Sequence, residues 1–483
     1  MSLQQYFRPF REKIVGSDYL LDNQPMIYAD WTASGRLYRP IEDFISREIG
    51  PLVANTHTEA SYCGSAMTRL YHESQQVIKH HLNASEDDVL ICAGAGMTAV
   101  INKFQRILGL RVPEKWAERF SIDESEKPLV LITHMEHHSN QTSWNECEVT
   151  LEVVPQNDQG MPDLEALKRI LLEYTDKPLK IGSFTACSNV TGIKTDYYQF
   201  AKIMHQHGGF CFIDFAASAP YVDIDMHPAD PLMRLDAVLF SPHKFLGGPG
   251  SSGVLVFNKS LYKNKVPDNP GGGTVTWTNP WGEHRFYENI EIREDGGTPG
   301  FLQSIRTALA IKLKDAMGVD NIQRREKELV VSLFEGLRQI PQVKILHHWN
   351  INRLCVVSFY IIDIHFNLIV RILSDRFAIQ TRGGCSCAGT YGHILLGVDQ
   401  AASGEITRLI DQGDFSRKPG WVRISLHPTS GDEEVDRIVH AIKLLVKNID
   451  VWKNDYEFDP HLGDFILKRV KPESLSLARF SAL

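Results

Sequence analysis

The sequence predicts an α/β fold, in which a large domain with a mostly parallel seven-stranded sheet precedes a smaller C-terminal α+β domain. From about residue 22 to residue 310, short apolar runs alternate with longer amphipathic stretches, as strands and helices alternate in a layered α/β domain. Most of these apolar runs end in small or polar residues, which suits parallel strands with functional loops at their carboxyl ends. The predicted strands span residues 26–30, 88–93, 128–134, 179–186, 209–216, 237–241 and 253–257.

The second half of the chain has a different order of elements. A long helix is expected over residues 298–318, as a bridge between the two domains. It is followed by a helix, two strands, a helix, a loop rich in glycine and cysteine, a strand and a last helix. The expected units are an N-terminal arm at 1–25, the large domain at 26–310, the small domain at 311–450 and a C-terminal tail at 451–483.

The composition is that of a soluble globular protein. Of 483 residues, 43% are hydrophobic and 23% charged, and 51 basic against 59 acidic side chains give a net charge of -8. This balance provides no electrostatic footprint for nucleic acid or an anionic membrane, and no apolar run is long enough to span a bilayer. The N-terminus lacks the apolar core of a secretory signal, and the eight cysteines are scattered, several as small residues within apolar runs. We therefore expect a cytoplasmic protein without a disulfide framework.

Lys244 closely follows a predicted strand, in a Ser-Pro-His-Lys segment with glycines just behind it. A lysine attacks a carbonyl carbon when its ammonium pKa is lowered, although a lysine in this place is also compatible with a solvated surface residue. Asp214 ends another buried strand, thirty positions earlier. A carboxylate there needs a cation or several donors, and either a protonated heteroaromatic nitrogen or a helix or turn cap would serve.

A glycine-rich turn follows the strand at 88–93 and opens a helix. Backbone N–H groups at such a helix start, together with the Thr98 hydroxyl, form a cradle for an anion. The same stretch also satisfies the loose dinucleotide-binding pattern through Gly94, Gly96 and Ala99, with Glu136 after the next strand. That alternative is a nicotinamide-dependent oxidoreductase, and it leaves Lys244 and Asp214 without a role.

His137 lies in a Met-Glu-His-His-Ser-Asn loop after a further predicted strand. Its imidazole is suited to stacking on a flat cofactor. An ordinary polar loop is one alternative, and a metal site with His138 is another, although adjacent histidines rarely chelate one ion.

The loop at 380–393 holds Cys385 and Cys387 among several glycines. Arg382 and His393 lie nearby in the sequence and favour the thiolate, which is the nucleophilic form of cysteine. A redox disulfide between the two cysteines is the alternative interpretation.

These five segments, in this order, resemble the class V aminotransferase group of fold-type-I pyridoxal-phosphate enzymes, from about residue 27 to residue 445. The motifs are most similar to those of cysteine desulfurases and selenocysteine lyases, with molybdenum-cofactor sulfurase a more distant relative. The resemblance implies pyridoxal 5'-phosphate as cofactor, a homodimer, and L-cysteine or a similar amino acid as substrate. It also implies release of alanine, a persulfide on a loop cysteine and a sulfur-acceptor protein as partner.

The resemblance also implies roles for individual residues. Lys244 would carry the cofactor as a Schiff base, His137 would stack on its ring, and Cys387 would accept the sulfur. Asp214 would pair with the pyridine nitrogen, and Thr298 matches a residue that family members lend to the partner subunit's phosphate. The other cofactor-binding residues would be Gly96, Met97, Thr98, Asn189, Ser241 and His243. The substrate would be bound by Arg423, Asn189 and Arg382, no metal is expected, and Asp30, Ala33 and Ser34 match the early substrate-channel segment.

Three features depart from the family pattern. Ala217 stands where a glutamine usually donates to the ring oxygen, with Ser218 as a substitute donor, and Cys385 stands where desulfurases commonly have histidine. The stretch between Cys387 and Arg423 is longer than in compact desulfurases. Sulfur transfer therefore has a rival in an aminotransferase, epimerase or β-lyase that acts on another amino acid. A structural subunit without cofactor would not need Lys244, Asp214 and His137 together.

Overall fold

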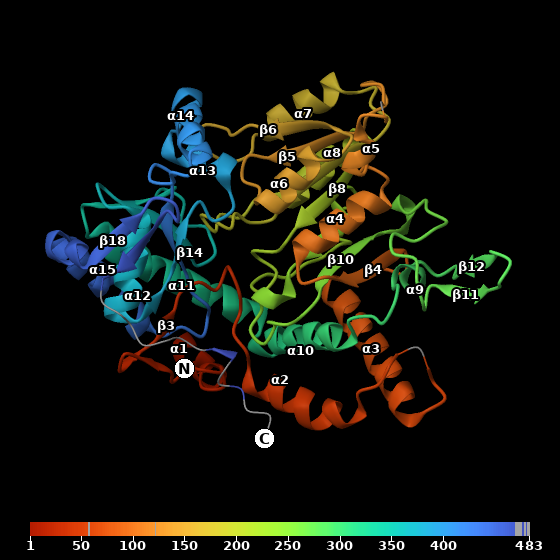
Figure 1. Ribbon diagram of the computed structural model, residues 1–483, viewed down its shortest axis with the longest axis horizontal. Helices are drawn as coiled ribbons and strands as arrows, with labels where there is room; N and C mark the ends of the chain where they lie inside the picture. The colour runs from red at the N-terminus through yellow and green to blue at the C-terminus, as the bar shows by residue number, and fades with distance from the viewer. Residues whose placement is uncertain (57, 121, 469–475, 478–479, 481–483) are drawn as a thin grey trace.

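The larger of two main sheets has seven strands and is mostly parallel, as predicted, and it occupies the right half of Figure 1. The structure is a computed structural model that describes residues 1–56, 58–120, 122–468, 476–477 and 480. In spatial order the strands are β4 (Asp88–Ala93), β10 (Gly253–Asn258), β9 (Ala237–Phe240), β8 (Phe210–Asp214), β7 (Lys180–Thr185), β5 (Leu129–Thr133) and β6 (Thr150–Val154). Only β10 runs against its neighbours, and we call this assembly the large sheet.

Helices cover both faces of the large sheet. Every residue of β5 and β7 is buried, as expected for parallel strands packed on both sides. One face carries α3 (Tyr62–His81), α7 (Leu164–Glu173), α8 (Tyr197–Gln206) and α10 (Phe301–Met317), with α3 packed along α10 (Figure 1). The other face carries α4 (Met97–Ile107) and α6 (His138–Asn145).

A second, antiparallel sheet of four strands, the small sheet, lies at the left of Figure 1. Its strands in spatial order are β13 (Val343–Ile345), β14 (Val356–Ile361), β17 (Trp421–Ser425) and β16 (Arg382–Gly384). It shares a hydrophobic core with α11 (Val319–Arg338), α12 (Phe366–Phe377) and α15 (Asp432–Trp452). Two further helices, α13 (Gly389–Leu396) and α14 (Gln400–Asp411), fill the long stretch between β16 and β17. The expected domain limits stay a prediction.

The seven predicted strands differ from the observed ones at one place. The run at 26–30 does not join the large sheet, because its core, β3 (Ile27–Tyr28), pairs in parallel with β15 (Ile379–Gln380). The seventh place is taken by β6, an edge strand that the sequence does not reveal because it is only partly buried and carries Glu152 in its middle. The prediction that the strand at 26–30 belongs to the large sheet is therefore wrong.

Shorter elements complete the fold. In the first part of the chain these are α1 (Leu3–Arg11), β1 (Leu20–Leu21), β2 (Gln24–Pro25), α2 (Arg39–Phe44), a π-helical turn (Ile45–Ile49), a 3₁₀ turn (Gly50–Leu52) and α5 (Glu114–Ala117). Further along are 3₁₀ turns (Pro231–Met233, Pro242–Lys244, Lys259–Leu261, Lys453–Asp455), β11 (Val275–Thr278), β12 (His284–Phe286), α9 (Ile290–Glu294), β18 (Tyr456–Asp459) and β19 (Asp464–Leu467). Among the residues that the structure describes, no helix is both long and apolar enough to cross a membrane.

Candidate active site

A pocket of about 780 Å³ brings most of the predicted site residues together at the carboxyl edge of the large sheet. The residues come from the ends of several parallel strands and from the small sheet opposite. Those predicted from the sequence are Gly96, Met97, Thr98, His137, Asn189, Asp214, Ser241, His243, Lys244, Arg382, Cys387 and Arg423. Thr298 is exposed and does not line this pocket in its own chain.

Lys244 and Asp214 provide an amine and a carboxylate in one low-dielectric site. Asp214 is the last residue of β8 and is buried, and its Oδ1 accepts a hydrogen bond of 2.8 Å from the Ala216 N–H. Burial raises the pKa of Asp214 to about 6, while this hydrogen bond and Lys244 oppose the rise. Burial lowers the pKa of Lys244 to about 8, and the charge of Asp214 opposes that fall. The neutral, nucleophilic form of Lys244 is therefore a minor species near neutral pH, but it is far more populated than in an ordinary lysine.

The start of α4 brings together several of the polar groups that the predicted anion cradle would use. The Met97 N–H donates 2.8 Å to Ser241 Oγ, and the Thr98 and Ser139 hydroxyls lie 2.6 Å apart. A Cβ at Gly96 would lie 3.1 Å from Ser241 Oγ, so the close approach of the two segments favours glycine. Hydroxyls and free N–H groups at a helix start bind phosphate well.

His137 and His138 have separate partners. His137 caps α6 by accepting a 3.1 Å hydrogen bond at Nδ1 from the Ser139 N–H, and burial lowers its pKa to about 3, so its ring is neutral and available for stacking. His138 binds the cysteine loop: its N–H donates 2.7 Å to the Cys387 carbonyl oxygen, and its Nε2 accepts 2.8 Å from the Gly389 N–H. Within the described part of the chain, no cluster of three or more His, Cys, Asp or Glu side chains is placed to hold a metal ion.

The Cys387 thiol is exposed at the pocket. Ser386 and Cys387 both have positive φ angles, 51° and 58°, which non-glycine residues adopt only when the surroundings hold them. Besides His138, the Asn189 side-chain amide holds this turn, donating 2.6 Å to the Ser386 carbonyl oxygen. His393 instead bonds Gly389 and Ser403, and Cys385, like the other seven cysteines in the described chain, is a free thiol.

Arg423 on β17 is buried at the side of the pocket formed by the small sheet. Its Nη1 donates 3.0 Å to the Asn189 carbonyl oxygen, and its Nη2 donates 2.7 Å to Asp30 Oδ1. Arg382 Nε donates 3.0 Å to Asp30 Oδ2. The sequence prediction gave Asp30 no binding role; its signal is a carboxylate directly after a short apolar run, the same signal that singled out Asp214.

The departures from the family pattern also have a place in the structure. Ala217 lines the pocket, whereas Ser218 is buried and does not line it. Glu136, which the dinucleotide alternative needs for a ribose, is buried and accepts hydrogen bonds from Thr133, Asn140 and Thr185. Its carboxylate is already satisfied inside the protein, so the geometry disfavours that alternative.

The pocket fits a phosphorylated pyridine aldehyde. It has donors for a phosphate, a carboxylate for a ring nitrogen, an amine for an aldehyde and an imidazole for the face of a ring. The buried Asn189 Oδ1 and Arg423 Nε also lack hydrogen-bond partners among the described residues. Unsatisfied buried polar atoms at a pocket favour a polar ligand there.

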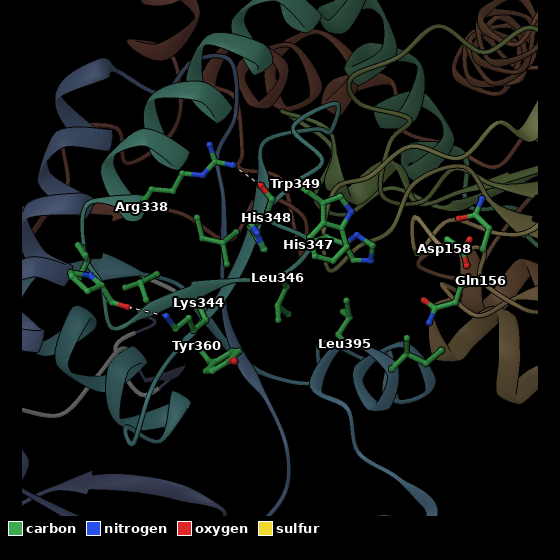
Figure 2. A pocket seen from close by; sticks show the side chains of 17 residues that line it. Gln156, Asp158, Arg338, Lys344, Leu346, His347, His348, Trp349, Tyr360 and Leu395 are labelled. Atoms are coloured by element: carbon green, nitrogen blue, oxygen red, sulfur yellow. Dashed lines mark hydrogen bonds between the residues drawn. The ribbon is translucent and has the colours of Figure 1, made fainter.

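A second pocket, of about 1060 Å³, lies between the loop at 156–160 and the small sheet (Figure 2). Its cations are already engaged, because Arg338 donates to the His348 carbonyl oxygen and Lys344 to that of Pro341. Its lining contains no lysine beside a buried carboxylate. The larger volume therefore does not make it the better candidate for chemistry.

The mostly parallel sheet and the pocket at its carboxyl edge define a pyridoxal-phosphate-dependent enzyme of fold type I. The family model for aminotransferase class-V proteins matches residues 27–438, and the chain belongs to this family. The resemblance predicted from the motifs is confirmed.

Relatives of known sequence and structure carry cysteine desulfurase names. The chain is 27% identical over 431 residues to a "Probable cysteine desulfurase" of Staphylococcus epidermidis, covering 88% of this chain and 92% of that protein. The corresponding Staphylococcus aureus protein is 26% identical over 379 residues, covering 77% and 85%. The apo cysteine desulfurase of Thermococcus onnurineus superposes with a TM-score of 0.73 at 23% identity, covering 91% and 98%, and the Escherichia coli cysteine desulfurase CsdA with 0.69 at 19%, covering 92% and 99%. At these identities the two solved structures establish the fold.

Proposed function

We propose that this protein is a cysteine desulfurase-type enzyme, which releases alanine from L-cysteine and keeps the sulfur on Cys387 as a persulfide. One observation carries the proposal: the exposed Cys387 thiol lines the same pocket as the amine of Lys244 and the guanidinium of Arg423. The names of the relatives support the same activity.

The residues that would hold pyridoxal phosphate surround this pocket. The start of α4, Ser241 and His243 would bind the phosphate, Asp214 the ring nitrogen, and His137 the ring face, with Lys244 as the covalent attachment point. When bound, the cofactor supplies an electron sink for the bond that breaks at the α-carbon of the amino acid.

The chain's own groups then orient the substrate and move its protons. Arg423 would bind the substrate carboxylate with donors that its protein partners leave free, and Asn189 would lie beside it. The Lys244 amine, lowered in pKa by burial, would accept the α-proton. Positioning and charge stabilisation supply most of the acceleration in such a site.

Sulfur transfer would follow as an attack by the Cys387 thiolate on the substrate sulfur. A sulfur–sulfur bond forms and the carbon–sulfur bond breaks. The electron pair of the broken bond stays with the carbon fragment, which takes up a proton and leaves as alanine. The exposed position of Cys387 suits passage of the sulfur to an acceptor protein.

A spectrum and a product assay test the proposal. Purified protein should absorb in the visible range, borohydride should remove that band, and L-cysteine should give alanine without a keto-acid acceptor. Cys387→Ala should keep the visible band and lose alanine release, while Cys385→Ala serves as the matched control. Alanine release at the wild-type rate by Cys387→Ala would exclude the proposed role of this thiol.

The rival function keeps the cofactor and acts on another amino acid as an aminotransferase, epimerase or β-lyase. Ala217 favours it, because this position offers no donor to the cofactor ring. A visible band together with turnover that requires a keto acid, or that leaves L-cysteine intact, would identify this rival.

A further inference from the structure

Asp30 lies between the two arginines of the pocket. Its Oδ1 accepts from Arg423 Nη2 at 2.7 Å and its Oδ2 accepts from Arg382 Nε at 3.0 Å. The side chain of Arg423 is 3% exposed and that of Asp30 14%, whereas that of Arg382, which also lines the pocket, is 44% exposed. The ion pair with Arg423 is therefore poorly screened by solvent.

The backbone fixes this arrangement. Arg382 stands directly opposite Arg423 in the antiparallel pairing of β16 with β17. Two like charges in opposed positions repel each other and destabilise the pairing. Asp30 follows β3 and forms a bridge with Ser425 at the end of β17, where the Thr32 N–H also donates 3.0 Å to Ser425 Oγ. These contacts hold Asp30 where its carboxylate reaches both guanidinium groups.

Arg423 retains donors for a ligand. A guanidinium group has five N–H donors, and the partners found in the described part of the chain engage one donor each on Nη1 and Nη2 of Arg423. Arg423 Nε is buried without a hydrogen-bond partner among the described residues, and Arg423 lines the pocket. Asp30 itself is not part of the lining, so it holds Arg423 from behind.

Arg382, Arg423 and Asp30 together determine the net charge where a substrate carboxylate would bind. Two cations and one anion leave one net positive charge, which matches one carboxylate. Without the anion, two neighbouring cations would face the ligand, and a ligand with a second anionic group would gain from the second charge.

We propose that Asp30 is a specificity-determining residue, which orients Arg423 and limits the pocket to amino acids with a single anionic group. It would disfavour amino acids whose side chains are also anionic, such as aspartate or a sulfinate. The proposal deepens the proposed function, since it relies on Arg423 as the site of the substrate carboxylate.

Ligand binding to the holoenzyme tests this role without turnover. The shift of the visible band on titration with L-alanine and with L-aspartate gives two dissociation constants. The wild type should prefer L-alanine, and Asp30→Asn, which keeps the size of the side chain, should change the ratio of the two constants by about tenfold or more in favour of L-aspartate. An unchanged ratio in a folded Asp30→Asn holoenzyme would overturn the proposal.

Arg382→Gln is the matched control, because it changes the net charge in the opposite direction to Asp30→Asn. It removes one cation, so both ligands should bind more weakly and L-aspartate should lose more, by about tenfold in the ratio. Asp30→Asn combined with Arg382→Gln restores one net positive charge, and its ratio should return to within about threefold of the wild type. A purely structural role of Asp30 predicts no such rescue. If Asp30→Asn alone does not fold, an unchanged ratio in Arg382→Gln overturns the proposal instead.

The two proposals fail in distinguishable ways. A wild-type protein without a visible band, or one that binds L-alanine but does not release alanine from L-cysteine, contradicts the proposed function. A wild-type protein that desulfurates L-cysteine, with the same ligand ratio in all variants, contradicts only the role of Asp30.

Discussion

Lys244 shows how burial prepares a single side chain for chemistry. An amine attacks an aldehyde only in its neutral form, and an ordinary lysine is almost fully charged at neutral pH. Desolvation in the pocket disfavours the ammonium ion and brings the pKa of Lys244 to about 8, although Asp214 works in the opposite direction. The neighbouring His137 and His243 are neutral because burial lowers their pKa values to about 3 and 4.

The pKa of Lys244 predicts the pH dependence of cofactor attachment. A group with a pKa near 8 is mostly protonated below this pH and mostly neutral above it, so the rate rises with pH. When cofactor-free protein is mixed with pyridoxal phosphate, the rate at which the visible band appears should rise about tenfold between about pH 7 and pH 9 and then level off. An ordinary lysine would keep accelerating to about pH 10, and that outcome would contradict the lowered pKa.

The residues of the site differ in how far the sequence alone could identify them. Lys244, His137 and Cys387 lie in short contiguous motifs, so their neighbours in the sequence already indicate their chemistry. The contacts of Asp30 join it to Arg382 and Arg423, which are more than 350 positions away in the sequence. The pairing of β16 with β17 brings the two arginines together, and the bridge between Asp30 and Ser425 adds the carboxylate. The sequence around Asp30 encodes neither contact.

At the scale of an element, the turn from β4 into α4 is tightly packed beside the pocket. Gly94 has a φ of 57°, and a Cβ there would lie 2.3 Å from the Ala99 Cβ in the first turn of α4. Gly109, just beyond the other end of the same helix, has a φ of 73° and no atom within 4 Å of its ideal Cβ. Both glycines have a positive φ angle, but only at Gly94 would an added Cβ collide with another side chain.

This difference makes Gly94 and Gly109 a matched pair. Each change to alanine should cost about 1 kcal/mol of stability, because alanine is strained at positive φ. Gly94→Ala should also displace the start of α4 and weaken cofactor binding by about tenfold or more, whereas Gly109→Ala should stay within about threefold of the wild type. Fluorescence titration of the cofactor-free variants measures both affinities, and equal losses would show that contact with Ala99 is unimportant.

The strands that the sequence predicts best are those that are buried along their whole length. β5 and β7 are buried on both faces and therefore appear as continuous apolar runs. β6 lies at the sheet edge, where polar residues are tolerated, and so it lacks that pattern. The run at 26–30 is apolar for another reason, since Ile27 and Ala29 contribute to the core of the small sheet. Apolar character predicts burial, but it does not tell which sheet a strand joins.

At the scale of the whole molecule, Thr298 supports a proposal about assembly. It is exposed and does not line the pocket of its own chain, and the family resemblance implies that this residue contacts the phosphate site of a partner subunit. We propose a homodimer, with a mass twice the 54.7 kDa of one chain, in which each pocket uses Thr298 from the other subunit.

Subunit mixing tests this assembly. Lys244→Ala and Thr298→Val should each have little activity alone, because one lacks the amine and the other weakens the partner's phosphate site. After unfolding and refolding together in equal amounts, half of the dimers should be mixed and should contain one intact pocket each. About one quarter of the wild-type alanine release is then expected. No gain over the separate variants would contradict sharing of Thr298, and light scattering provides the mass as a control.

The two sheets contribute different chemical groups to the pocket. Asp214 ends a strand of the large sheet, and Lys244 and His137 lie in segments that follow other strands of it, whereas Arg382 and Arg423 belong to strands of the small sheet. If the proposed function holds, an amino acid bound through its nitrogen at Lys244 and through its carboxylate at Arg423 would link the two sheets. A compound with only one of these groups would lack one of the two contacts, so we expect substrate binding to hold the two sheets in one relative alignment.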